Sequence, residues 1–486
     1  MNYDLCVRHA LVIDGTGSPG YRANLFIREG RIGDITAPEI VHNATRVIDA
    51  DGMVVTPGFI DTHAHGNPIR TPFFGNFLAM GVTSLCLGQD GDSPTDPVSW
   101  FHSLENLSLG PNISLFIGHG TARNETGVGI NPEPSSQQLK AMQQFVREAM
   151  KAGCLGLSTG LEYQPGSFAK TNELVALAYP VAKADGVIMS HLRSEDDDAI
   201  ERALAELLEQ GLQSHCPVHV SHLKVTYGRG AGRAERVLQQ METARQKGLR
   251  VTADLYPYLA SYTGISIIFP SWAKPPFDYA QVVRTRRGEL AEYLRVRVLL
   301  RNGPQATLLA TPPWTGKTLQ RVAEQLEKPF EDVLIDEMGP SGAQAAYFVM
   351  DAPLQQRFLI DPHVMICSDG SPTMHHPRGH GAFARIIRKY VIEKQILSLE
   401  QAIHKMTGLP ASTTGLNQLG RGRIAVGCAA DLLIFDPKQV KDNATFEQPH
   451  KPASGFTWVL VNGQIVIEHG LPTATRSGTV LKRSGS

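Results

Sequence analysis

Short apolar runs alternate with helical stretches through the middle of this chain, and this alternation limits its fold more than any other feature. The eight runs read FIDTHAH, VTSLCLGQD, ISLFIGHG, CLGLSTGLEY, GVIMSHLRSE, PVHVSHLK, RVTADLYPY and VMICSDG. Between most of them lie segments such as SSQQLKAMQQFVREAMKAG, with apolar residues at i, i+3 and i+4 and a glycine after the end. Eight strand and helix units predict an α/β fold, a (β/α)8 TIM-like barrel over residues 58–410.

The two ends of the chain and one internal segment depart from this alternation. Residues 1–57 and 411–486 contain short apolar-polar alternations broken by Gly, Asp-Gly and Pro, which is typical of β-hairpins. We therefore expect a small β-sandwich domain built from both termini. A stretch of about 270–351 is too long for one crossover and contains helical patterns, so we expect an insertion between strands 7 and 8.

The composition excludes several classes of function. Lys and Arg number 46 against 47 Asp and Glu, with no basic stripe, so we expect neither nucleic acid nor a membrane surface as partner. Six scattered cysteines without a Cys-x-x-Cys pair indicate reduced thiols. No signal peptide is recognisable, and no apolar run approaches the roughly 20 residues of a membrane span. We expect a cytoplasmic enzyme with a small-molecule substrate; a homo-oligomer is compatible with these features.

Polar side chains follow the predicted strands at their carboxyl ends. His63 and His65 follow strand 1, His191 and His222 end strands 5 and 6, and Asp369 ends strand 8. One histidine in such a place is usually a core residue with its own hydrogen bond. Five polar groups at corresponding strand ends each need a partner, and a shared cation supplies one for all of them. Imidazoles with a carboxylate predict one or two zinc ions, with Mn, Fe or Co as rivals.

A metal centre of this kind predicts hydrolytic chemistry. The pKa of metal-bound water falls to about 7, so hydroxide becomes available at neutral pH. Asp369 beside it is placed to accept the proton of the nucleophile and to pass it to a leaving group. These residues do not specify which bond is cleaved.

The motifs resemble those of the amidohydrolase superfamily and, within it, of the N-acyl-D-amino-acid deacylases, or D-aminoacylases. The resemblance runs almost from end to end and includes VIDGTG, PGFIDTHAH, GLSTGLEYQPG, SHLRSE, SHLK, DLYPY, SDG followed by HHPRGHGAFARI, AIHKMTGLPAS and AADLLIFDP. A His-x-His after a strand is shared by the whole superfamily. The ordered set STGLEY, HLRSE, SHLK and HPRxxGxFxR is specific to the deacylase branch.

The resemblance implies roles for individual residues. His63, His65 and Asp369 would hold one metal site, and His191 and His222 would belong to the other. Asp369 would double as the catalytic acid and base.

The resemblance also implies how the substrate is held. Lys224 and Arg378 match positions that grip the α-carboxylate, and Tyr256 matches a tyrosine near the carbonyl or carboxylate of the substrate. The planar fork of Arg suits bidentate carboxylate binding, and Lys adds a point charge. Each residue has a structural alternative: Arg378 as a loop stabiliser, Lys224 as the partner of a nearby carboxylate, and Tyr256 as core packing.

The sequence departs from the family pattern at the end of strand 2. Typical members carry a cysteine there in a Gly-Asn-Cys-Gly context, whereas this chain has GQDG with Asp90 at that place. Cys86 lies four residues earlier, too deep to substitute. Asp90 is the favoured bridging metal ligand, and Glu162 at the end of strand 4 is the competing candidate. His119 after strand 3 either reaches the substrate or is a hydrogen-bonded loop histidine.

These features together predict metal-dependent hydrolysis of the amide bond in N-acyl-D-amino acids, giving a carboxylate and a free D-amino acid. Alternatives on the same scaffold are a cyclic amide, a dipeptide or a larger N-acylated natural product as substrate. A non-catalytic binding barrel is the alternative from a different class. The intact set of ligands argues against it, because disused sites lose ligands.

Overall fold

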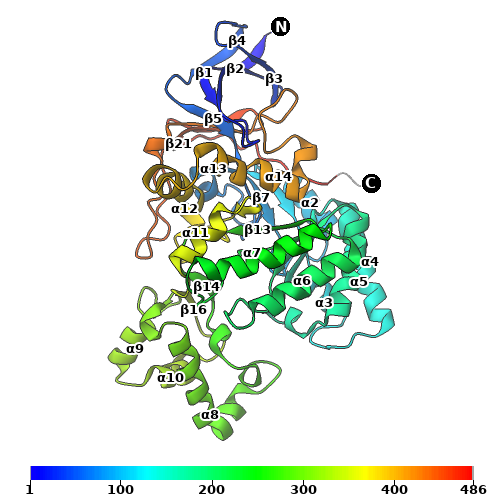
Figure 1. Ribbon diagram of the computed structural model, residues 1–486, viewed down its shortest axis with the longest axis vertical. Helices are drawn as coiled ribbons and strands as arrows, with labels where there is room; N and C mark the ends of the chain where they lie inside the picture. Colours follow the sequence, from blue (N-terminus) through cyan, green and yellow to red (C-terminus); the bar gives the residue numbers. More distant parts are fainter. Residues whose placement is uncertain (1, 484–486) are drawn as a thin grey trace.

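All eight predicted strands are present in the computed structural model, which describes residues 2–483 (Figure 1). They pair side by side in parallel, in chain order. Phe116 alone separates the two pieces of the third strand, and a parallel bridge between Ala64 and Gly370 joins the first strand to the eighth. The fold is therefore a closed α/β barrel. Its strands are β6 (Phe59–Asp61), β7 (Val82–Leu87), β8 (Asn112–Leu115) with β9 (Ile117–Gly118), β10 (Gly156–Gly160), β11 (Val187–His191), β12 (Val218–Val220), β13 (Val251–Leu255) and β17 (Val364–Ile366).

Amphipathic helices cover the outside of this barrel (Figure 1). In α6 (Ile200–Ser214) the apolar positions Ala203, Leu204, Leu207 and Leu208 are buried, while the charged residues between them are not. The strands themselves are buried almost throughout, as expected for parallel strands covered by helices. The other barrel helices are α1 (Gly75–Ala79), α2 (Pro97–Glu105), α3 (His119–Glu125), α4 (Ser136–Ala152), α5 (Thr171–Lys183), α7 (Ala231–Gln246), α11 (Ala352–Ile360), α12 (Arg378–Arg385), α13 (Leu399–Met406) and α14 (Gly408–Thr414).

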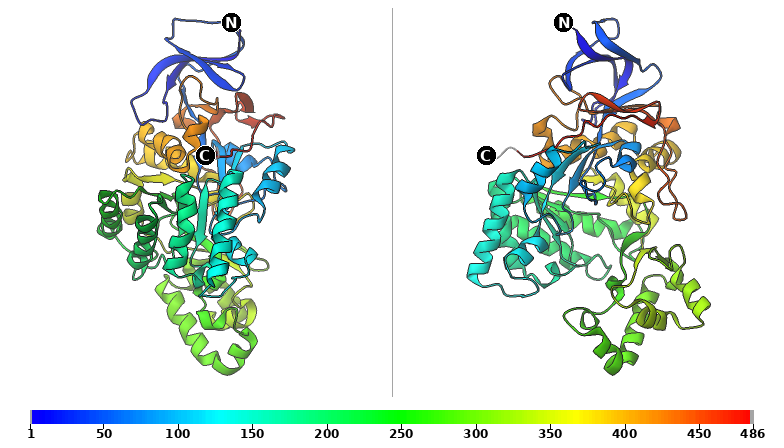
Figure 2. Two further views of the ribbon diagram at one scale, coloured as in Figure 1. Left: turned by 90° about the vertical axis from the view of Figure 1, so that its right-hand side faces the viewer. Right: turned by 180° about the vertical axis from the view of Figure 1, so that it is seen from behind.

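Strands from the two ends of the chain form one nine-stranded sheet at the end of the molecule where the N-terminus lies (Figures 1 and 2). Strands β5 and β18 pair antiparallel, from Leu432 opposite Pro57 to Phe435 opposite Val54, and so connect the two ends. The predicted division of this region into a two-layered sandwich domain stays a prediction. The strands are β1 (Tyr3–Val12), β2 (Tyr21–Arg28), β3 (Arg31–Thr36), β4 (Ala44–Asp49), β5 (Val54–Pro57), β18 (Leu432–Phe435), β19 (Phe456–Val461), β20 (Gln464–Glu468) and β21 (Leu471–Pro472).

A separate helical segment lies between β13 and β17 and projects from the opposite end of the barrel (Figures 1 and 2). It has an apolar core of its own, to which Ile265, Leu290 and Leu319 contribute. It starts earlier than the expected 270, because Ser261–Gly264 already pairs with its last strand. The elements are β14 (Ser261–Gly264), α8 (Tyr279–Leu300), β15 (Thr307–Leu309), α9 (Leu319–Leu326), α10 (Phe330–Val333) and β16 (Gln344–Tyr347).

Two expectations from composition can be compared with the structure. The six cysteines are all buried and unpaired, as the scattered spacing predicts. Within residues 2–483, none of the helices combines the length and the apolar composition that crossing a bilayer requires.

Candidate metal centre and active site

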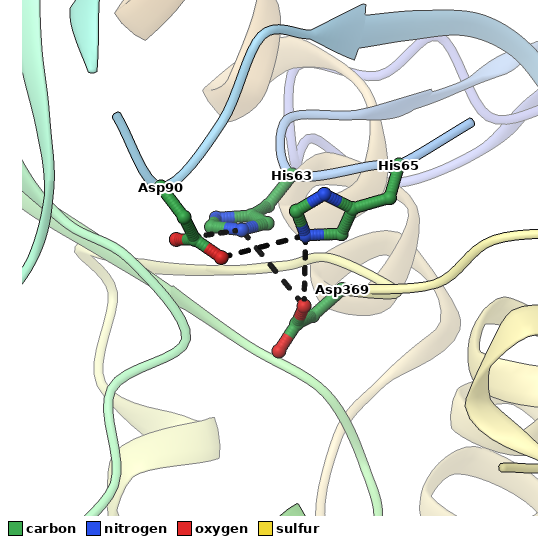
Figure 3. Close-up of side chains that lie close together, drawn as sticks. All are labelled: His63, His65, Asp90 and Asp369. Carbon is green, nitrogen blue, oxygen red and sulfur yellow. Dashed lines mark hydrogen bonds and ion pairs between the residues drawn. The ribbon is translucent and has the colours of Figure 1, made fainter. Parts of the chain in front are cut away.

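Four of the predicted ligands converge at the carboxyl ends of β6, β7 and β17 (Figure 3). His63 Nε2 lies 3.3 Å from Asp90 Oδ1, and His65 Nε2 lies 3.5 Å from Asp90 Oδ2 and 3.2 Å from Asp369 Oδ1. Backbone hydrogen bonds from Asp369 N to His63 O and from His65 N to Gly370 O, each 2.8 Å, fix the two segments against each other. The four side chains offer their ligand atoms within 4.8 Å of one another, which is the spacing of a metal site.

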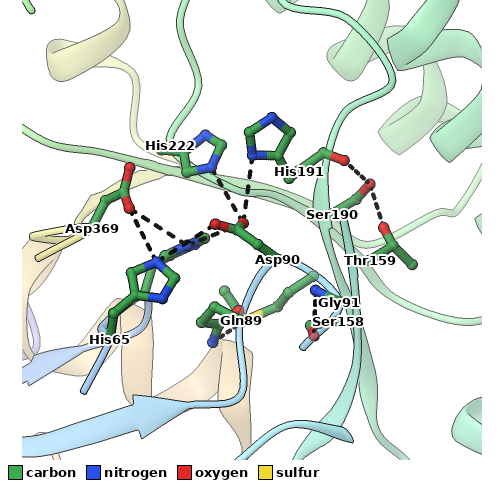
Figure 4. A network of polar contacts seen from close by, with 12 residues as sticks. His65, Gln89, Asp90, Gly91, Ser158, Thr159, Ser190, His191, His222 and Asp369 are labelled. Atoms are coloured by element: carbon green, nitrogen blue, oxygen red, sulfur yellow. Dashed lines mark hydrogen bonds and ion pairs between the residues drawn. The ribbon is translucent and has the colours of Figure 1, made fainter. Parts of the chain in front are cut away.

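Asp90 also takes part in a second group, with the histidines that end β11 and follow β12 (Figure 4). Its Oδ1 atom lies 3.5 Å from His191 Nδ1 and 3.5 Å from His222 Nε2. One carboxylate thus stands between His63 and His65 on one side and His191 and His222 on the other. A carboxylate in this position would contact both ions if two were bound.

Several of the converging atoms lack hydrogen bonds. His63 Nε2, Asp90 Oδ1 and His191 Nδ1 are buried, and none has a hydrogen-bond partner within residues 2–483. Buried polar atoms without partners are rare and costly, and a cation between them would satisfy all three. Imidazole nitrogens with carboxylate oxygens are the donor set that zinc prefers. The residues therefore fit a divalent transition metal.

The electrostatics keep the carboxylates ionised. Burial raises the pKa of the Asp90 carboxyl, but His63, His191 and His222 outweigh burial and hold this pKa well below its usual range. Burial also opposes ionisation of Asp369, whose pKa is nevertheless lowered, chiefly by the charge of Arg378. Both aspartates are therefore anionic and able to bind metal at neutral pH.

Three of the candidate ligands have unusual backbone conformations. The φ angles of Asp90, His222 and Asp369 are +55°, +39° and +47°, in the left-handed region that residues other than glycine rarely adopt. The turn that carries Asp90 also packs tightly on β10, where a Cβ on Gly160 would lie 2.0 Å from the carbonyl oxygen of Asp90. Such conformations persist where the surrounding structure enforces them, and they cluster at functional sites.

Glu162 and Asp90 contact different ring nitrogens of His191. The Oε2 atom of Glu162 is 3.1 Å from His191 Nε2, whereas Asp90 faces the other ring nitrogen, Nδ1. A carboxylate on the second nitrogen orients a ligating imidazole and fixes its tautomer. Glu162 also forms a third group of potential ligands with His191 and Glu195. Of the two acids weighed from the sequence, only Asp90 joins both histidine pairs.

Glu195 is a site residue that the sequence reasoning missed. Its Oε1 atom lies 3.0 Å from His222 Nδ1 and 2.6 Å from Lys224 Nζ. Glu195 belongs to the SHLRSE motif, four residues after His191. Its place in this motif is the sequence signal that could have identified it as a site residue. Because the strand ends at His191, the following turn brings Glu195 back toward the centre.

Asp254, at the end of β13, was also missed, although it is fully buried. One of its oxygens accepts from the His222 amide at 2.5 Å, and the other from the Thr62 hydroxyl at 2.6 Å. Its Oδ2 atom also lies 3.0 Å from His219 Nε2. Asp254 therefore links two ligand-bearing segments, through the His222 amide and the Thr62 side chain.

The residues expected to grip a carboxylate lie beside the ligands. Arg378 Nη1 is 2.9 Å from Asp369 Oδ2, and Lys224 Nζ is 2.6 Å from Glu195 Oε1. Both cations face the ring of Tyr256. The centre of this ring lies 4.5 Å from the Arg378 guanidinium carbon and 5.7 Å from Lys224 Nζ. Burial raises the pKa of Tyr256 to about 12, so its hydroxyl remains a hydrogen-bond donor. These side chains line one recess next to the metal ligands.

His119 does not join the ligand groups. It is fully buried, and its Nε2 atom lies 2.8 Å from Glu173 Oε1, a carboxylate that also pairs with Arg123. This arrangement corresponds to the alternative of a hydrogen-bonded histidine, and the expectation that His119 reaches the substrate stays a prediction.

A larger hollow opens on the other side of the centre. It has a volume of about 660 Å³ and reaches His65, Asp90 and Tyr163, with further polar lining from Asn67 and Gln164. The metal ligands thus lie between a cationic recess and an open polar hollow.

A closed parallel barrel with histidines and aspartates at its strand ends is the architecture of a metal-dependent amidohydrolase. In agreement, the model of the amidohydrolase family matches residues 306–467. The chain is 33% identical to N-acyl-D-glutamate deacylase from Alcaligenes xylosoxydans xylosoxydans over 99% of its own length and 97% of that protein. It is 32% identical to D-aminoacylase from the same organism over 100% and 98% of the two chains.

Solved structures give the same result. The crystal structure of N-acyl-D-glutamate deacylase from Bordetella bronchiseptica, complexed with zinc and a phosphonate mimic of the tetrahedral intermediate, matches with a TM-score of 0.86 and 30% identity. That match covers 99% of this chain and 100% of the other. The chain therefore belongs to the N-acyl-D-amino-acid deacylase family, as its motifs predict.

Proposed function

We propose that the protein hydrolyses the amide bond of N-acyl-D-amino acids and releases a carboxylate and a free D-amino acid. The observation that carries this proposal is the position of the metal-ligand groups directly beside the buried cations Arg378 and Lys224. The similarity to deacylases along the whole chain supports it.

Zinc is the proposed cofactor, with Mn, Fe or Co as rivals, in one or two positions. His63, His65 and Asp369 would hold one ion, His191 and His222 the other, with Asp90 between them. A bound ion would polarise the acyl carbonyl and lower the pKa of the attacking water.

Asp369 is the proposed acid and base. Its Oδ1 atom faces His65 at 3.2 Å, and Arg378 holds its other oxygen at 2.9 Å, so the carboxylate is oriented from both sides. It accepts a proton as water adds to the acyl carbon, and it donates that proton to the amide nitrogen as the C–N bond breaks. The acyl group leaves as the carboxylate and the nitrogen as the amine.

Arg378 and Lys224 would bind the α-carboxylate, with Tyr256 donating a hydrogen bond. The α-carboxylate would lie at one side and the carbonyl at the ligand groups; the D configuration is proposed from the similarity to N-acyl-D-glutamate deacylase and D-aminoacylase. The acyl group would then extend into the hollow that His65 and Asp90 line. A larger N-acylated natural product is a second candidate substrate, because about 660 Å³ exceeds what an acetyl group needs.

Amine release from matched N-acetyl-D- and N-acetyl-L-amino acids tests the proposal. We expect turnover of the D series only, in line with the similarity to deacylases of N-acyl-D-amino acids. Equal rates for both series would contradict the proposed configuration. Turnover of neither series by protein with bound metal would exclude simple N-acetyl amino acids and favour the larger substrate.

A further inference from the structure

A chain of polar side chains crosses the barrel beneath the metal ligands and has no role in the steps above. It runs from Thr252 in β13 through His219 in β12 to Asp254 in β13, and from there to Thr62 after β6. His219, Asp254 and Thr62 are fully buried. Strand β17 lies between β6 and β13 in the barrel, so the bond from Thr62 to Asp254 passes through the barrel interior.

Asp254 joins one ligand-bearing segment from each of the two histidine pairs. One of its oxygens accepts from the His222 amide at 2.5 Å, and the other accepts from the Thr62 hydroxyl at 2.6 Å. Thr62 directly precedes His63, whose ring centre lies 4.8 Å from the ring centre of His222. The carboxylate therefore fixes the spacing between a histidine of one pair and a histidine of the other.

The backbone of His222 depends on this support. Its φ angle of +39° lies in the left-handed region that residues with a Cβ rarely adopt. Asp254 holds both sides of the turn, because its side chain accepts from the His222 amide and its backbone carbonyl accepts from the Leu223 amide at 2.7 Å. Such a conformation persists where the surrounding structure enforces it. The direction of the His222 side chain therefore depends on Asp254.

His219 contacts the same carboxylate oxygen as Thr62 does. Its Nε2 atom lies 3.0 Å from Asp254 Oδ2, and its Nδ1 atom lies 2.8 Å from Thr252 Oγ1. The ring nitrogen that faces a carboxylate carries a proton, so contacts at both nitrogens fix the orientation of the ring. A buried carboxylate without such partners is costly. The two oxygens of Asp254 therefore face three donor groups.

Asp61, a second fully buried carboxylate at the end of β6, uses only one oxygen. Its Oδ1 atom accepts from the amides of His63 at 3.2 Å and Ser368 at 3.0 Å. Its Oδ2 atom has no hydrogen-bond partner within residues 2–483. Asparagine keeps one acceptor oxygen and replaces the other with an NH2 donor. Asp61→Asn can therefore keep both contacts, whereas Asp254→Asn must lose one.

We propose that Asp254 and His219 are positioning residues that set the spacing of the two histidine pairs and so determine how tightly the centre binds metal. This inference rests on the metal centre of the proposed function. Neither residue belongs to the ligand groups found among the described residues. Both act through the His222 backbone and the segment that carries His63.

The Kd for zinc, measured by competition with a chelator of known affinity, tests the proposal. We expect Asp254→Asn to bind zinc about 10- to 100-fold more weakly than the wild-type protein, as for other residues that orient metal ligands. Asp61→Asn is the matched comparison, because it removes the same charge beside the same ligands, and it should change the Kd far less. Equal losses in the two variants would show that charge alone matters and would overturn the positioning role.

The visible spectrum of the cobalt-substituted protein gives a second readout, because it reports the geometry of the ligands. Asp254→Asn should shift this spectrum. His219→Gln places an amide donor near the position of Nε2 and should keep the wild-type spectrum and Kd, whereas His219→Leu should reproduce the effects of Asp254→Asn. If His219 only stabilises the fold, His219→Leu will lower the Tm without changing the Kd, and the proposal is overturned.

Thr62→Val tests the same link if Asp254→Asn does not fold. Valine has nearly the shape of threonine but lacks the hydroxyl that Asp254 binds, so zinc binding should weaken in the same direction. A wild-type Kd in all of these variants would overturn this inference alone. Absence of zinc binding by the wild-type protein would overturn the proposed cofactor as well.

Discussion

At the scale of single residues, Asp90 has the most demanding position in the site. One of its oxygens lies within 3.5 Å of ring nitrogens from His63, His191 and His222, and it has no hydrogen-bond partner in the described residues. The carboxylate stands where typical family members carry a cysteine. Because oxygen ligands are harder than thiolate, the site should tolerate Mn²⁺ or Fe²⁺ better than a cysteine-containing site.

Replacing Asp90 with Ala is expected to remove at least one bound metal ion per chain. The histidines it connects would then lose their shared anionic partner, and turnover should fall by about two orders of magnitude. Metal analysis of the purified variant measures this directly. Glu148→Ala, which removes an exposed carboxylate in α4, is the control and should keep both metal and activity. Unchanged metal content in Asp90→Ala would show that Asp90 is not a ligand.

The sequence predicts which side chains converge at the candidate metal centre, but not which residues these side chains contact. His63, His65, His191, His222 and Asp369 follow from their positions after apolar runs, because parallel strands in a barrel end at the same face. Lys224 pairs with Glu195, 29 positions away, and His119 pairs with Glu173, 54 positions away. Arg301 lines the recess although it belongs to the insertion. Such contacts depend on the conformation of the turns after the strands, which a local sequence pattern does not predict.

At the scale of elements, helix α4 shows how local sequence determines a boundary. The Ser135 hydroxyl accepts from the Gln138 amide at 3.2 Å, and the Gln138 side chain accepts from the Ser135 amide at 3.0 Å. This capping box satisfies two amides that a helix start leaves free. By contrast, strand β14 pairs with residues 80 to 86 positions later, so no local sequence pattern indicates that the insertion starts there.

Ser135→Ala is expected to destabilise the protein by about 1 kcal/mol, because the helix loses its N-cap. A urea unfolding curve should show a lower midpoint with activity retained, since α4 lies outside the site. Ser136→Ala, one residue into the helix, should leave the midpoint nearly unchanged. Equal effects of the two substitutions would contradict the assigned role of the cap.

At the scale of the whole molecule, one buried lysine makes folding stability depend on pH. Lys405 in α13 is 4% exposed, and its ammonium donates to the carbonyl oxygens of Asp361 and Val364. Burial lowers the pKa of Lys405 from 10.5 to about 8. Between these two values the unfolded chain binds more protons than the folded protein, so this group makes stability rise with pH. Below pH 8 both states are protonated, and the full cost of burying the charge remains.

Lys405→Met should therefore change stability differently at pH 7 and pH 9.5. Relative to this variant, the free energy of unfolding of the wild-type protein is expected to increase as the pH rises. The reason is that Lys405 loses its proton, and the cost of burying its charge disappears. Urea unfolding of both proteins at the two pH values measures the gain. The exposed Lys151, replaced in the same way, should show no such gain. A difference between wild type and Lys405→Met that is independent of pH would refute the assigned burial cost.

The most direct test of the central claim is activity measured against metal content. The protein is stripped with a chelator, assayed for amine release on an N-acyl-D-amino acid that the untreated protein hydrolyses, and then titrated with zinc. We expect turnover to vanish with the metal and to return as one or two zinc ions bind per chain. Undiminished turnover by protein without measurable metal would contradict the assignment of His63, His65, Asp90, His191, His222 and Asp369 as the centre of a metal-dependent deacylase.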